Sequence, residues 1–133
     1  MTRLRVVGLM LAALQAMGPM PARAHHSFAQ FDMHKSVTIT GTVKSVEWTN
    51  PHTWIWLVVT DASGTQKIWG LEGAAVGELT RKGWTRHSVV PGDKITADIH
   101  PLRDGREGGS FSRIVFADGR VLTTVSSAAA GSQ

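Results

Sequence analysis

Alternation of apolar and polar residues dominates the centre of this chain and predicts β-strands. Residues 36–48 alternate β-branched and polar side chains, and Gly41 suits a bulge or a sharp bend within one long strand. Residues 54–60 are rich in tryptophan and β-branched side chains, which also predicts a strand. Further strands are predicted at 65–71, 94–100, 110–116 and 120–125.

One segment between these strands has a helical spacing of apolar residues. Apolar residues recur within 74–79 at the spacing of an α-helix, and Gly83 follows as a glycine that can end the helix. Asp118-Gly119 predicts a tight hairpin between the last two strands, whereas residues 101–109, which include the glycine pair Gly108-Gly109, are predicted to form a loop. Three strands, a short helix and two or three more strands predict an all-β fold with one short helix, an OB-like barrel of five to six strands. A small β-sandwich is the alternative.

A short apolar segment at the start of the chain has the features of an export signal. Arg3 and Arg5 supply its positive start, residues 6–17 its apolar stretch, and residues 22–24 a small-x-small cleavage site. The stretch is too short to span a bilayer, and no later segment approaches the roughly 20 apolar residues of a spanning helix. We expect residues 1–24 to be a cleaved signal peptide, the protein to be periplasmic or secreted, and no transmembrane segment to be left after cleavage.

Removal of the signal changes the charge balance. The formal net charge is +4, but three of the 14 basic residues and none of the 10 acidic residues lie in the signal. The mature chain is therefore nearly neutral and lacks a concentrated basic patch, so we expect no nucleic-acid partner. Residues 25–125 are predicted to form a single barrel domain with an N-terminal arm, and residues 126–133 a disordered tail.

The composition and the motifs argue against most classes of enzyme. The chain has no cysteine, which excludes disulfides, thiolate metal sites, iron–sulfur clusters and thiol catalysis. It has no Gly-x-Ser-x-Gly, His-Glu-x-x-His, P-loop or dinucleotide-binding motif. The acidic residues of the loop, Asp104 and Glu107, each lie beside an arginine, as in a solvated turn. We assign no catalytic residue and expect a binding protein.

Four segments resemble an uncharacterised family of small exported bacterial proteins, a domain of unknown function. They are HHSFAQFD at 25–32, GTVKSVEWTNPH at 41–52, GDKITADIHPLRDG at 92–105 and DGR at 118–120. The paired N-terminal histidines and the later Asn-Pro-His are the most specific of these elements. The resemblance implies export and a β-rich fold, and it brings no established activity.

Cleavage after Ala24 would make His25 the first residue, with its α-amine and imidazole able to chelate one metal ion. Nitrogen donors in a tetragonal arrangement favour Cu(II), so a copper ion is the expected ligand. His52, after the Asn50-Pro51 turn, would supply a third nitrogen, with His26 as the competing donor. This site resembles the histidine brace of copper-dependent polysaccharide monooxygenases and of exported copper carriers, onto which only His25 and His52 map.

Two alternatives for these histidines stay open. Cleavage after Arg23 would place His26 third, in an amino-terminal motif where amine, two amides and imidazole surround Cu(II) or Ni(II). Otherwise His25 and His26 are polar residues of a flexible end, and His52 serves the turn after Asn50-Pro51.

Strand alternation separates the side chains of 54–60 onto two faces. Ile55, Leu57 and Val59 point one way, and Trp54 and Trp56 the other. If the aliphatic set faces the core, the two indoles lie on the outer surface, where they could stack on a ligand or be covered by the arm or the tail.

These features favour an exported copper carrier, buffer or accessory protein. The alternative is an envelope module that binds a protein or a glycan through Trp54 and Trp56, with the histidines incidental.

Overall fold

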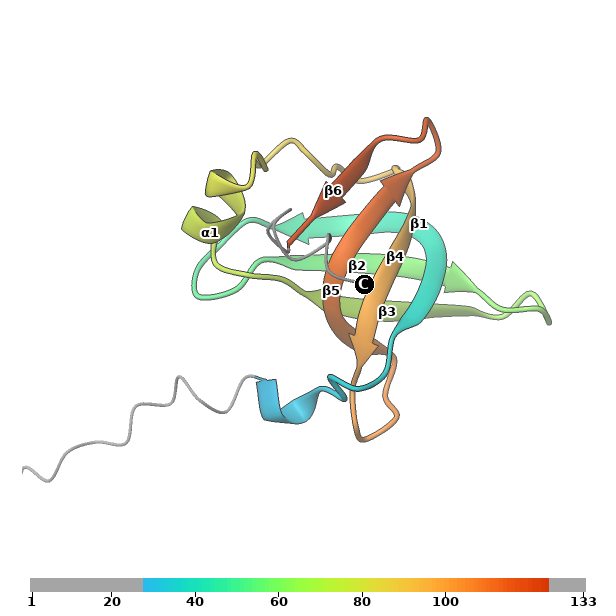
Figure 1. Ribbon diagram of the computed structural model, residues 1–133. Coiled ribbons are helices and arrows are strands. Elements are labelled where there is room, and N and C mark those ends of the chain that lie inside the picture. Colours follow the sequence, from blue (N-terminus) through green and yellow to red (C-terminus); the bar gives the residue numbers. More distant parts are fainter. Residues whose placement is uncertain (1–27, 125–133) are drawn as a thin grey trace, which may run out of the picture.

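The computed structural model describes residues 28–124, which form one six-stranded sheet and a short α-helix (Figure 1). The predicted signal peptide 1–24, the histidines His25 and His26, and the predicted tail 126–133 lie outside the described residues. In chain order the elements are η2 (Phe28–Gln30, a 3-10 helix), β1 (Val37–Glu47), β2 (Trp54–Thr60), β3 (Gln66–Glu72), α1 (Val76–Arg81), β4 (Lys94–Pro101), β5 (Gly108–Phe116) and β6 (Val121–Thr123).

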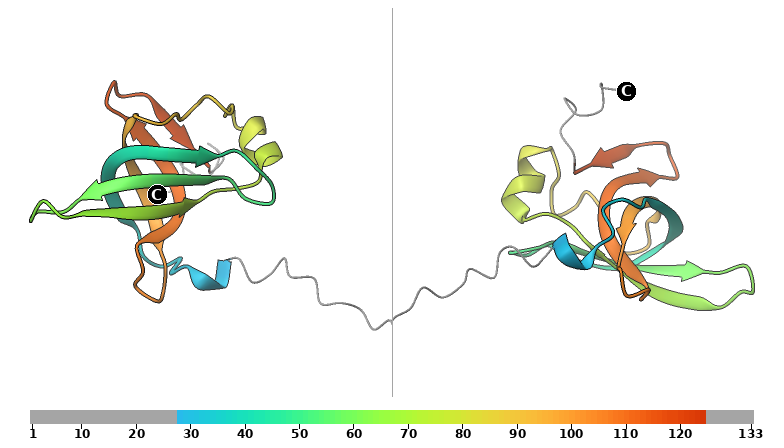
Figure 2. Two further views of the ribbon diagram at one scale, coloured as in Figure 1. Left: turned by 180° about the vertical axis from the view of Figure 1, so that it is seen from behind. Right: turned by 60° about the horizontal axis from the view of Figure 1, so that its bottom comes forward.

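The sheet closes on itself to form a barrel. Its strand order is β3-β2-β1-β4-β5-β6, and a parallel pairing of β3 with β5 joins the two ends of the five-stranded part. Strand β6 pairs with β5 outside this closed barrel, and α1 follows β3, as seen from two further directions in Figure 2. The predicted OB-like barrel is confirmed, and closure excludes the sandwich alternative.

Strand β1 belongs to both halves of the barrel. Its residues Val37–Thr42 pair with β4, and from Thr42 onward it pairs with β2. Gly41 lies at this change of partner, where a Cβ atom would be 2.4 Å from the carbonyl oxygen of Val58. The register irregularity between β1 and β2 falls at Lys44, so the bulge suggested for Gly41 lies three residues further on. Gly41 permits the close approach of two backbones.

The glycine pair predicted to lie in a loop is part of β5. Gly108 and Gly109 pair with β3, and a Cβ atom on Gly108 would be 2.9 Å from the carbonyl oxygen of Gly70 in β3. The loop assignment was wrong because the parallel contact that closes the barrel needs residues without side chains at this point. The final strand is also shorter than predicted and ends at Thr123.

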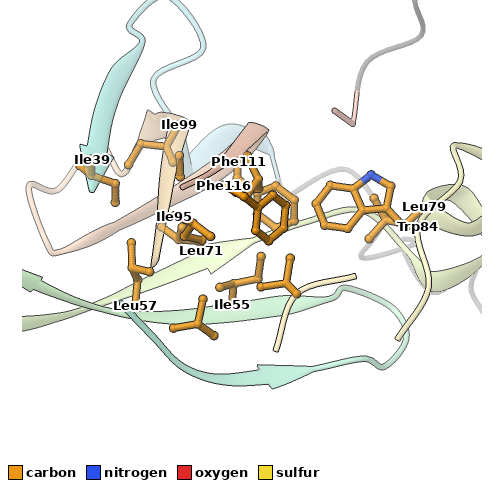
Figure 3. Packing of buried hydrophobic residues seen from close by; sticks show 14 residues of the cluster. Ile39, Ile55, Leu57, Leu71, Leu79, Trp84, Ile95, Ile99, Phe111 and Phe116 are labelled. Carbon is orange, nitrogen blue, oxygen red and sulfur yellow. The ribbon is translucent and has the colours of Figure 1, made fainter. Parts of the chain in front are cut away.

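The core fills the barrel and continues under α1 (Figure 3). Ile55 and Leu57 are fully buried, which confirms that the aliphatic face of β2 points inward. Trp84 is buried beside Leu79 of α1 and tilts against Phe111, at a ring-centroid distance of 5.6 Å. The buried cluster comprises Ile39, Val43, Ile55, Leu57, Leu71, Leu79, Trp84, Val89, Ile95, Ala97, Ile99, Phe111, Ile114 and Phe116.

The glycine predicted to end the helix does so. Gly83 has a φ of +88°, and its N–H donates to the carbonyl of Thr80, while the N–H of Trp84 donates to the carbonyl of Leu79. These two bonds form a Schellman motif. The motif directs Trp84 into the core.

Gly41→Ala should destabilise the barrel by about 1–3 kcal/mol, because its methyl group would overlap the backbone of β2. Gly77→Ala is the matched control, since the nearest atom to a Cβ atom there is Nη1 of Arg81 at 3.6 Å. The control should be neutral or stabilising by up to about 1 kcal/mol. Urea unfolding followed by circular dichroism measures both, and equal midpoints for the two variants would contradict the close-approach role of Gly41.

Candidate functional site

The turn before β2 positions His52. The Asn50–Pro51 peptide bond is cis, and Oδ1 of Asn50 accepts a hydrogen bond of 3.0 Å from the N–H of Val76 at the start of α1. Backbone hydrogen bonds join Thr53 to Ala74 and Gly73. These contacts hold the β1–β2 connection against the segment after β3.

His52 lies against Glu72 at the end of β3. Its Nδ1 is 3.1 Å from the carbonyl oxygen of Gly73 and 3.2 Å from Oε1 of Glu72. A carbonyl oxygen only accepts, so Nδ1 carries the proton, and the lone pair of the neutral ring is at Nε2. The ring is therefore held in one tautomer.

Glu72 is 5% exposed, and sequence reasoning missed it. Its Oε2 accepts a hydrogen bond of 3.0 Å from Nε2 of Gln30. A buried carboxylate is stable only when it is hydrogen-bonded or paired, and Gln30 and His52 supply such partners. The two predicted strands of the β2–β3 hairpin could have revealed Glu72, because their register places it directly opposite Trp54.

His52 and Glu72 open onto a pocket of about 270 Å³ at one end of the barrel. Phe28, the first described residue, and Thr124, the last, both line this pocket. The other lining residues are Phe31, Pro51, Gly73, Ala74, Ala75, Glu78, Ser110 and Phe111. The arm, through Phe28, and the residue after β6, Thr124, thus both border the pocket.

The structure brings no second histidine to His52 within residues 28–124. His34 and His87 are exposed, and His100 binds the carbonyl oxygen of Lys35 through Nδ1 at 2.8 Å. Among the described residues no group of three or more histidine, aspartate and glutamate side chains could hold a metal ion. A metal site at His52 would need donors from outside this range.

The predicted indole face is present on the outer side of β2. Trp54 and Trp56 stack with ring centroids 5.6 Å apart and an interplanar angle of 13°. Nε1 of Trp56 donates a hydrogen bond of 2.8 Å to Oε1 of Glu47. A Cβ atom on Gly70 would be 2.7 Å from the six-membered ring of Trp56, so the indole lies close against the backbone of β3.

The arm forms one wall beside the indoles. Phe31 is 2% exposed and Gln30 lies beside it, and both line a groove with Trp54 and Trp56. Phe28 is 62% exposed and lines the His52 pocket instead. The groove has a volume of about 430 Å³ and is further lined by Ile68, Gly70, Leu102, Arg106, Glu107 and Gly109.

Ion pairs neutralise the charged rim of this groove. Nε of Arg106 is 2.7 Å from Oδ2 of Asp104, and Nζ of Lys67 is 2.6 Å from Oε1 of Glu107. The backbone N–H of Arg106, followed by its side chain, lowers the pKa of Asp104. The hydrogen bond from Lys67 likewise lowers the pKa of Glu107. Both carboxylates are therefore ionised at neutral pH, in keeping with a solvated loop, although Glu107 pairs with a lysine and not with its neighbouring arginine.

Comparison with known proteins leaves the function open. No curated protein matches the sequence. No helix within residues 28–124 is long and apolar enough to cross a bilayer. A Family of unknown function (DUF6152) matches residues 13–111, a range that contains His52, Glu72 and both indoles of the groove. On this match, which spans most of the sequence, the chain belongs to the DUF6152 family of unknown function.

Proposed function

We propose that this protein is an exported metal carrier or buffer, with copper as its cargo, which binds Cu(II) between its processed N-terminus and His52. The observation that carries the proposal is the path of the arm. Phe28 lines the same pocket as His52 and Glu72, and Gln30 is hydrogen-bonded to Glu72. His25 precedes Phe28 by three residues, a span of at most about 10 Å. An amine at His25 is therefore within reach of this pocket.

The chemistry of the donors supports a metal ion. A free amine and imidazole at His25 would give a chelate, and the His52 tautomer has its lone pair at Nε2, the form in which an imidazole binds a metal. Hydrogen bonds from Nδ1 to a carboxylate and a carbonyl orient metal-binding histidines and raise their basicity. The negative charge of Glu72 also favours a cation in the pocket.

The choice of copper rests on ligand type. Nitrogen donors from an amine and two imidazoles favour Cu(II) over the other divalent first-row metals. Export rests on the signal-like residues 1–24.

The first test uses the exported protein, with its N-terminus established by intact mass. An additional alanine before His25 moves the amine without deleting a side chain, and His52→Ala removes one imidazole. Each change should weaken Cu(II) binding about tenfold or more, measured by calorimetric titration against a competing chelator. His34→Ala and His87→Ala, which alter exposed loop histidines, should have no effect.

Three results would contradict the brace. If the extended protein binds Cu(II) as tightly as the native one, the amine is not a ligand. If His52→Ala is silent while His26→Ala is severe, the amino-terminal motif replaces the brace. Retention of residues 1–24 in the exported protein would remove the proposed chelate altogether.

A second prediction concerns the role of Glu72 in orienting His52. Glu72→Gln retains the shape of the side chain but removes the carboxylate beside Nδ1, and it should weaken Cu(II) binding about tenfold. Glu78→Gln is the matched control, because Glu78 lines the same pocket but pairs with Lys82 at 2.9 Å. If the two variants lose affinity equally, the effect is one of pocket charge, and orientation of His52 is not its cause.

A further inference from the structure

We infer that the groove over β2 and β3 binds a neutral carbohydrate, with a pyranose ring seated against the Trp54–Trp56 pair. This site is separate from the proposed metal pocket, and the inference does not depend on metal binding. It rests on three features: the aromatic wall formed by Trp54 and Trp56, the balanced charges of Arg106 and Glu107 at the rim, and the position of the groove on the barrel.

The aromatic wall is held in place before any ligand binds. Trp56 is fixed at one end by the hydrogen bond from its Nε1 to Glu47 and at the other by its contact with Gly70. Trp54 stacks on it with nearly parallel rings. A side chain that is already ordered loses little conformational entropy on binding, so such a pair is suited to hold a ligand. The C–H face of a sugar ring packs on an indole, and its hydroxyl groups remain at the edge.

The rim provides polar groups without a net charge. Gln30, Arg106 and Glu107 line the groove, and they offer both donors and acceptors for hydroxyl groups. Arg106 and Glu107 are neutralised by Asp104 and Lys67 respectively. Binding of a nucleic acid would need several unpaired basic groups for its phosphates. A ligand with hydroxyl groups and no charge fits this arrangement better than a polyanion.

The dimensions and the position of the groove agree with a small oligosaccharide. Its volume of about 430 Å³ lies in the range of small-molecule sites. The groove lies between the indoles and the β4–β5 loop, from which Leu102, Arg106 and Glu107 line it. OB barrels bind oligosaccharides and oligonucleotides on this face, beside this loop, and the neutral rim favours the former.

Calorimetry and tryptophan fluorescence of the exported protein with maltohexaose, cellohexaose and chitohexaose test the inference, in the presence of a chelator that removes copper. At least one of these neutral glycans should bind, and Trp56→Ala should weaken its binding about tenfold or more. Gly70→Ala should do the same without deleting an indole, because its methyl group would displace the ring of Trp56. Trp48→Phe is the control, since Trp48 lines a different, small cavity beside Trp84.

Thermal midpoints separate loss of binding from loss of fold. Gly70→Ala and Trp56→Ala should remain folded, because both act on the outer face of the sheet. The inference is overturned if none of the three glycans binds at millimolar concentration, or if a bound glycan is unaffected by Gly70→Ala. It is also overturned if a proline-rich peptide or a polyanion such as heparin occupies the groove in place of the neutral glycans.

Discussion

The barrel closes because one strand, β1, pairs with β4 along its first half and with β2 along its second. This double pairing brings the backbone of Gly41 so close to the carbonyl oxygen of Val58 that a Cβ atom at position 41 would overlap it. A second contact without side chains, between β3 and the glycines at the start of β5, joins the remaining edges. Closure then directs Ile55, Leu57, Leu71 and Ile95 into one core, and their burial stabilises the fold.

Closure also creates both candidate sites at the margins of the barrel. The arm passes between them, since Phe31 lines both the His52 pocket and the indole groove. Gln30 lines the groove and donates to Glu72. The arm is therefore a shared wall, held by backbone hydrogen bonds to Pro101 and Arg103 and by the bond from Gln30 to the buried carboxylate of Glu72. Burial of Glu72 without these partners would cost several kcal/mol, so the polar cluster and the path of the arm depend on each other.

Electrostatics distinguish the two sites. In the pocket, the carboxylate of Glu72 lies beside an imidazole and favours a cation. Around the groove, Arg106 and Glu107 each have an opposite charge within 3 Å. The surface of the groove therefore has little net electrostatic field. Two candidate sites of different chemistry thus lie close together on a small barrel.

Local sequence pattern determined most of the secondary structure. The predicted strand at 54–60 matches β2 residue for residue, and Gly83 stops the helix shortly after Arg81, as expected. Both features depend on the conformational preferences of a few neighbouring residues. The sequence also indicated His52 and the indole face of Trp54 and Trp56. Only the tertiary structure assigned Gly108 and Gly109 to the closing strand and paired Glu72 with Gln30, 42 residues away. These contacts depend on how segments far apart in the sequence align with one another. That alignment is set by which faces become buried in the folded barrel, and local propensity does not encode it.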